Sequence, residues 1–147
     1  MAEQKIIEFE TRLGMQKVTL DQVLRFPKGL IGYEDKRDFV LLRIREGVPF
    51  LVLQSLETPS LGLMVADPYQ FLENYSIKIS DAEQHMLNLT SQEQASVLVT
   101  VTIPPGNPEE TCLNMVGPIV INHEARVGLQ VPQIDPVQSA KIFLYKQ

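Results

Sequence analysis

The main pattern along the chain is an alternation of apolar and polar positions with a period of two, which is typical of half-buried β-strands. The clearest case is the run 97–103, where every second residue is Val or Ile. It ends at the proline-rich segment 104–108, where prolines remove the donors that a ladder needs. Similar alternations or short apolar runs predict the other strands. These runs cover residues 7–13, 15–20, 39–44, 50–54, 61–66, 75–79, 111–115, 118–121 and 127–131.

Helical signals are few and short. Ser80 and Glu83 have the spacing of a capping box, which predicts a short helix ending near Leu87. Residues 90–93 and 68–72 each predict one further helical turn. The strand spacing therefore predicts an all-β fold, a small antiparallel β-barrel-like domain with a few short helices. We expect one domain over residues 1–147, with 132–147 as a C-terminal arm whose residues 142–144 either dock as a last strand or stay mobile.

The charge is unevenly distributed. Residues 1–45 carry nine basic and seven acidic residues, whereas 46–125 carry one base, Lys78, against ten acids. Such a stretch predicts a negative field over part of the surface. It argues against nucleic-acid binding, which requires Lys and Arg to neutralise phosphates. A basic protein partner fits it better, as does a purely solubilising role.

Few residues suggest chemistry. The chain has one cysteine, Cys112, and two histidines, His85 and His123, which are too few for an ordinary zinc site. We therefore expect no catalytic, cofactor-binding or metal-binding site. Two alternatives stay open: a cryptic hydrolase or isomerase that uses Cys112, His85 or His123, and a nucleic-acid-binding β-barrel.

We expect no signal for export or membrane insertion. Its first ten residues contain three glutamates and no apolar run follows, unlike a secretory leader. No apolar run approaches the ~18 residues that span a bilayer. With a single cysteine, no disulfide can form within the chain. We expect a cytoplasmic protein without membrane contact.

Three stretches of sequence together resemble the FliW family of bacterial flagellar assembly factors. The first is 26–34 (FPKGLIGYE) with 39–42 (FVLL), and the second is 49–57 (PFLVLQSLE) with 65–69 (VADPY). The third is 114–122 (NMVGPIVIN) with 126–131 (RVGLQV). Their order and spacing resemble the family over nearly the whole chain. One position differs, because Ile31 stands where the family turn commonly has proline, and this change is expected to loosen the turn.

The resemblance implies a function without catalysis. Proteins of this family bind the carbon-storage regulator CsrA, a basic dimer that represses translation of flagellin messenger RNA, and they also bind flagellin. Export of flagellin frees the factor to bind CsrA, and this binding, thought to be allosteric, relieves repression. The resemblance thus implies two protein partners, CsrA and flagellin, and no direct contact with nucleic acid. We expect the protein to act as a monomer.

Candidate contacts come from the acidic stretch. Polar residues that flank predicted strand ends are expected to face a basic partner, where they would speed encounter and fix orientation. These residues are Glu57, Asp67, Glu73, Asp81 and Asn122. Asp67 and Asp81 also fit turn or cap positions, and Asn122 could bond a neighbouring loop. Gly29, Gly32 and Gly117 are expected to adopt backbone conformations that other residues resist.

Overall fold

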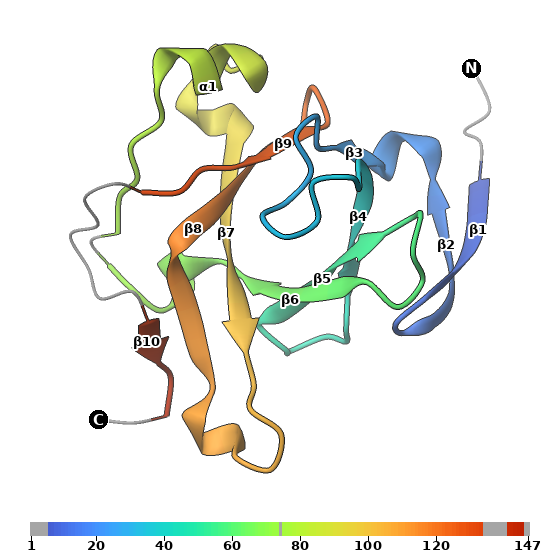
Figure 1. The fold of residues 1–147 in the computed structure, drawn as a ribbon, viewed down its shortest axis with the longest axis vertical. Coiled ribbons are helices and arrows are strands. Elements are labelled where there is room, and N and C mark those ends of the chain that lie inside the picture. Colours follow the sequence, from blue (N-terminus) through green and yellow to red (C-terminus); the bar gives the residue numbers. More distant parts are fainter. Residues whose placement is uncertain (1–5, 74, 134–140, 146–147) are drawn as a thin grey trace.

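The computed structural model describes residues 6–73, 75–133 and 141–145. Figure 1 shows a barrel of strands, with a hairpin on one side and a short helix at one end. The strands are β1 (Ile6–Thr11), β2 (Gly14–Thr19), β3 (Leu24–Arg25), β4 (Asp38–Arg43), β5 (Phe50–Ser55), β6 (Gly62–Ala66), β7 (Ala95–Thr102), β8 (Cys112–Asn122), β9 (Val127–Gln130) and β10 (Lys141–Phe143). The helix is α1 (Asp81–Met86), and the 3-10 turns are η1 (Leu20–Gln22), η2 (Pro68–Gln70), η3 (Gln92–Gln94) and η4 (Pro108–Glu110).

The main sheet closes on itself. Its strand order is β10-β8-β7-β6-β5-β4-β3-β9, and β9 also pairs with β8. Neighbouring strands are antiparallel except β3 and β9, which meet in parallel at Arg25 and Val127. Closure leaves the strands of the ring without a free edge, the usual liability of a sheet. The predicted all-β, barrel-like fold with few short helices is confirmed.

A bulge divides β8 into two halves. Leu98 of β7 pairs with Ile119, but Thr100 pairs with Asn114, so that one residue of β7 faces residues 115–118 of β8. Residues 119–122 pair with β9 inside the barrel, whereas 112–114 pair with β10. We call the first part the barrel half. The second part, with residues 99–102 of β7 and with β10, is the ribbon, which extends below the barrel in Figure 1.

Aromatic rings fill the barrel interior. Phe26 and Phe39 are fully buried and pack edge to face, with ring centroids 5.3 Å apart. Gly128 of β9 lies against Phe26, where a Cβ atom would come within 2.3 Å of the ring. The side chains of Leu53 and Ile119 complete the centre of this cluster. The barrel therefore needs glycine at 128 because the Phe26 ring occupies the side-chain space.

A second apolar cluster lies under the ribbon and contains Tyr75, Val99, Leu113 and Met115. The Tyr75 hydroxyl is buried and has no hydrogen-bond partner among the described residues. Burial raises the pKa of this phenol to about 12, and the electrostatic effect of the neighbouring Tyr69 phenol adds to the shift. The centroids of the two rings lie 5.6 Å apart. As far as the described residues go, the ribbon core therefore contains a buried polar group that no hydrogen bond satisfies.

The β1–β2 hairpin forms a separate two-stranded sheet against the barrel. Arg12 in its turn anchors it, because its Nη1 donates to Gly62 O at 2.7 Å and its backbone N–H donates to Gln54 Oε1 at 3.0 Å. Gln54 is fully buried, and its Nε2 donates to Ser55 O and Pro59 O. The Gln54 side chain therefore joins the hairpin to the β5–β6 turn.

The structure corrects three strand predictions. Residues 75–79 form no strand, and the edge of β8 that β7 leaves free is paired with β9. Ile77 and Ile79 still pack on the core, and Lys78 bonds the Gln133 side chain through its N–H and its carbonyl. The runs 111–115 and 118–121 form one strand, β8, that continues through the bulge. No alternation in the sequence predicted the two-residue strand β3, although β3 completes the ring between β4 and β9.

The helical predictions are confirmed, and of the two outcomes left open for 142–144 the structure shows docking. Ser80 and Glu83 form the expected capping box of α1, η2 and η3 lie where single turns were expected, and 142–144 dock beside β8 through β10. Other residues of the arm, 134–140 and 146–147, lie outside the described part of the chain. None of the helices in the described ranges has both the length and the apolar character needed to cross a bilayer.

Candidate functional site

Two of the five residues predicted to contact a partner, Glu57 and Asp67, form hydrogen bonds that stabilise loops of this chain. The Glu57 carboxylate accepts hydrogen bonds from the backbone N–H groups of Arg37 and Asp38, at 3.1 and 3.4 Å, and so anchors the start of β4. Asp67 caps η2, where its Oδ1 accepts from Tyr69 N at 2.9 Å. Both carboxylates therefore have structural roles.

Glu73 and Asp81 are more available to a partner. Both side chains are exposed, and neither has a hydrogen-bond or ion-pair partner among the described residues. Asp81 opens α1, where an acid also favours the helix N-terminus. These two residues fit the expected solvent-facing acids.

Asn122 is buried, with 1% of its surface exposed. Its Nδ2 donates to Leu87 O at 2.8 Å and to Asn88 O at 3.1 Å, and its Oδ1 accepts from the N–H groups of Glu124 and Ala125. All of its hydrogen-bonding capacity is directed inward. Asn122 thus joins the end of α1 to the β8–β9 turn and offers no polar atom to a partner.

The acidic stretch does not form one continuous face. Glu57 lies beside the first residue of β4 and Glu46 follows its last, so the length of that strand separates them. Likewise, Glu93 precedes β7 and Glu109 follows it. The sequence placed these acids in one stretch, but antiparallel strands send successive turns to opposite ends of the barrel.

One group of acids does gather at the end that carries α1. Asp81 and Glu83 lie on α1, Glu93 lies on η3, and Glu124 lies in the β8–β9 turn. The Gln94 Nε2 atom donates to the Glu124 carboxylate, and this bond fixes η3 beside the turn. We call this set of four the acidic end.

The residues of the enzyme alternative are dispersed. Cys112 is buried at the start of β8 and His123 follows the end of that 11-residue strand, while His85 is exposed on α1. Ser96 Oγ lies 3.1 Å from His123 Nδ1, a pair that sequence spacing did not suggest. No described carboxylate bonds His123 as the third member of a triad. No group of three or more His, Cys, Asp or Glu residues in the described ranges could hold a metal ion.

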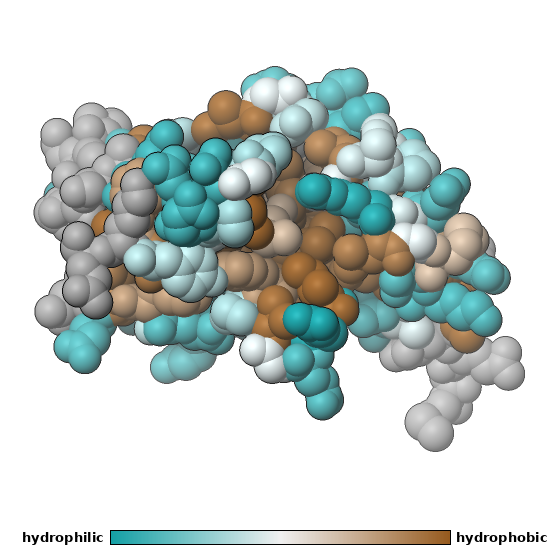
Figure 2. Space-filling model, turned by 90° about the horizontal axis from the view of Figure 1, so that it is seen from below, coloured by the Kyte–Doolittle hydropathy of each residue, from teal (hydrophilic) through white to brown (hydrophobic). Residues whose placement is uncertain are grey.

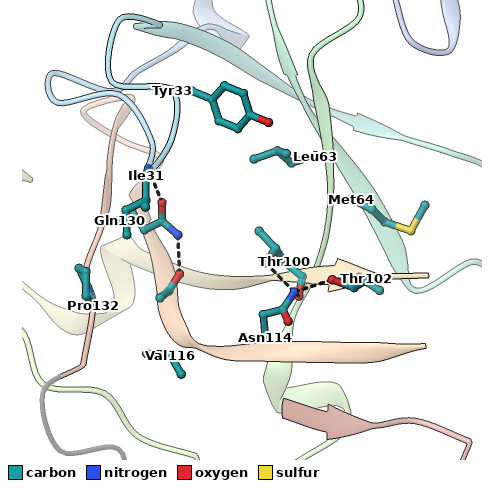
Figure 3. Close-up of a pocket in the computed structure, with 12 residues that line it drawn as sticks. Ile31, Tyr33, Leu63, Met64, Thr100, Thr102, Asn114, Val116, Gln130 and Pro132 are labelled. Carbon is teal, nitrogen blue, oxygen red and sulfur yellow. Dashed lines mark hydrogen bonds between the residues drawn. The ribbon is translucent and has the colours of Figure 1, made fainter. Parts of the chain in front are cut away.

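A groove of about 460 Å³ lies between the 30–33 loop and the ribbon. Figure 3 shows Tyr33 and Leu63 on one side and Thr100, Asn114 and Val116 on the other. Twelve residues line it and none is charged, although 21% of the chain is. Viewed from below, the molecule has apolar surface across its middle with polar residues around it (Figure 2). Sequence reasoning missed the groove because its walls come from five separate segments.

Gln130 joins the two walls of the groove. Its Oε1 accepts from Ile31 N at 2.8 Å and its Nε2 donates to Gly117 O at 2.9 Å (Figure 3). Proline at position 31 would lack this N–H, so isoleucine there permits a hydrogen bond to Gln130 that proline would remove.

The glycine predictions hold at two of three positions. Gly29 and Gly32 adopt positive φ, at 64° and 89°. Gly117 does not; there a Cβ would lie 3.0 Å from Gln130 Nε2, so glycine leaves room for the Gln130 side chain.

Comparison with known proteins agrees with this architecture. A sequence model described as FliW protein matches residues 7–143. A flagellar assembly factor FliW from Nitratidesulfovibrio vulgaris (strain DP4) is 56% identical over 145 residues, covering 99% of this chain and 84% of the relative. One from Thermosipho africanus is 36% identical, covering 85% and 86%. A crystal structure of the flagellar assembly factor FliW superposes with a TM-score of 0.88 at 28% identity, covering 96% of this chain and 99% of that one. The chain therefore belongs to the FliW family of flagellar assembly factors.

Proposed function

We propose that this flagellar assembly factor acts in the cytoplasm by binding two proteins in turn, the translational regulator CsrA and flagellin. When flagellin is exported, the freed factor binds CsrA and relieves repression of flagellin messenger RNA. Membership of the FliW family is the observation that carries the proposal. The dispersed Cys112, His85 and His123 and the uncharged groove are compatible with a protein-binding role.

The acidic end is the surface we assign to the basic regulator. Asp81 has an exposed carboxylate there, with Glu83, Glu93 and Glu124 on neighbouring elements. A local negative potential attracts a basic protein and raises its association rate more than its affinity.

The direct test is calorimetric titration of the protein with CsrA and with flagellin from the same organism. We expect a complex with each. A short CsrA-binding RNA at saturating concentration should leave association with CsrA measurable, as an allosteric mode requires. If neither protein binds, the proposed function is wrong.

A charge reversal at the acidic end tests the surface. Asp81→Lys should slow association with CsrA about three- to tenfold at low salt, and added salt should shrink the difference because surface charges are screened beyond ~10 Å at 0.1 M. Glu109→Lys is the matched control, because it makes the same charge change on η4 at the other end of β7. Stopped-flow rates that fall equally for both variants would show that net charge alone matters.

A further inference from the structure

We propose that the outer edge of β1 is a strand-addition site for an extended segment of another protein in which apolar and basic residues alternate. The site lies on the β1–β2 hairpin, apart from the acidic end, and the inference does not depend on the two proposed partners. Its basis is a free strand edge with acids on one face and half-buried apolar side chains on the other.

β1 differs from the strands of the ring because only one of its edges is paired. It pairs with β2 from Ile6 to Thr11 and with no other strand in the described chain. No backbone hydrogen bond of residues 6–11 to another described residue occurs outside this ladder. β2 is the inner strand, since its buried Val18 packs against β4, and Figure 1 shows β1 outermost on its side. The outer edge of β1 therefore has the unpaired N–H and C=O groups that an added strand needs.

The two faces of β1 indicate which side chains the added strand carries. Glu8 and Glu10 are exposed on the outer face, whereas Ile7 and Phe9 face the barrel and are half-buried. Ile7 and Phe9 pack against the apolar cluster around Val18. Side chains of adjacent strands lie beside one another on the same face of a sheet. Apolar residues of the added strand would extend this cluster, and the alternate, basic residues would lie beside the two glutamates.

Glu10 provides most of the selectivity for a basic segment. In the register of the hairpin, Glu8 pairs with Lys17, but Glu10 pairs with the uncharged Met15. Among the described residues, Glu10 has no ion-pair partner. Opposite charges on adjacent strands stabilise the pair and like charges destabilise it. A lysine or arginine of the added strand is therefore favoured beside Glu10.

The same charges exclude a second copy of this chain as the occupant. If two β1 strands paired antiparallel about Glu8, the two Glu8 side chains would face each other. If they paired about Phe9, Glu8 would face Glu10 of the second copy. Both registers place like charges directly opposite, and charged residues on edge strands prevent such self-association. The edge thus remains available to a strand of opposite charge.

A designed peptide tests the site. A peptide of about ten residues with alternating valine and lysine should bind the wild-type protein in calorimetric titration, and the matching valine–glutamate peptide should not. Glu10→Lys should weaken binding of the valine–lysine peptide about fivefold or more, because an attractive cross-strand pair becomes repulsive. Glu109→Lys makes the same charge change on η4 and should stay within about twofold of wild type.

Two measurements distinguish strand addition from attraction by charge alone. N-methyl groups on two adjacent central residues of the valine–lysine peptide remove a donor from each of its edges but keep its charge. This peptide should bind about tenfold or more weakly than its parent. On the protein, the parent peptide should slow hydrogen exchange at alternate amides of residues 6–11, those that point away from β2.

Each result decides the proposal. It is wrong if the valine–lysine and valine–glutamate peptides bind equally, or if Glu10→Lys and Glu109→Lys lose affinity to the same extent. Unchanged binding of the N-methylated peptide, or unchanged exchange in β1, also contradicts it. If no peptide binds, the glutamates only protect the edge. The titrations with CsrA and flagellin test the proposed function separately, so either proposal can fail while the other stands.

Discussion

The barrel half and the ribbon half of β8 belong to one strand but have different surroundings. Residues 119–122 lie between β7 and β9, and each is at most 2% exposed. Residues 112–114 lie between β7 and the three-residue β10, and Asn114 faces the groove. The bulge at 115–118 makes the change possible, because it inserts unpaired residues and turns the strand. One strand can therefore contribute both to the barrel core and to the wall of the groove.

The largest difference is expected between the barrel core and the ribbon core, in the unfolding free energy lost when a side chain is truncated. Phe26→Ala would leave a cavity at the centre of the barrel and should lower the free energy of unfolding by about 3–5 kcal/mol. Ile142→Ala, on β10, removes a half-buried side chain and should cost about 1 kcal/mol. Urea denaturation measures both. Similar losses would show that β10 is as integral to the fold as the barrel.

Two asparagines on β8 allow a finer comparison. Asn122→Ala leaves the buried Leu87 carbonyl, the Asn88 carbonyl and two N–H groups without their partner and should destabilise the protein by about 2–3 kcal/mol. Asn114 is partly exposed and donates to Thr100 and Thr102, so Asn114→Ala should cost less than about 1 kcal/mol. Thermal unfolding of the two variants measures both losses of stability. A larger loss at Asn114 would contradict the division of β8.

The smallest effect is expected at Tyr75 under the ribbon. Because its hydroxyl is buried without a hydrogen-bond partner in the described part of the chain, Tyr75→Phe should change the unfolding free energy at pH 7 by less than about 1 kcal/mol, in either direction.

The pH dependence of stability distinguishes Tyr75→Phe from wild type. A tyrosine ionises near pH 10 when unfolded, but the folded state holds the Tyr75 proton to about pH 12. The stability from this group is therefore complete below pH 10 and is lost as the pH rises toward 12, by up to about 1.4 kcal/mol per pH unit. Chemical denaturation between pH 9 and 11 should show a steeper decline for wild type than for Tyr75→Phe. Equal slopes would mean that the hydroxyl is solvated.

Local patterns predicted most of the fold. The alternation at 97–103, the Ser80 capping box and the glycine turn at 29–32 depend on neighbours within a few residues, and the structure confirms each. The segment 75–79 shows the limit of this reasoning. Alternation reports that a segment is extended and half-buried, but it does not report whether a strand is available to pair with it.

The candidate site was less predictable. From charge and spacing, five residues were equally plausible contacts to a partner. In the structure, Glu57, Asp67 and Asn122 form hydrogen bonds within the chain. Glu73 and Asp81 are exposed. The groove had no sequence signal, since Ile31, Leu63 and Val116 are ordinary apolar residues far apart in the chain.

By itself, the sequence determined the β-rich barrel, the short capped helix and the family, because these follow from local periodicity, capping chemistry and motifs in a fixed order. Only the tertiary structure decided the bulge in β8, the closure through β3, the distribution of the acids to both ends and the groove between the 30–33 loop and the ribbon. These features depend on which distant strands pair and in what register. Pairing is set by the packing of the whole core around Phe26 and Phe39, which no short stretch of sequence contains.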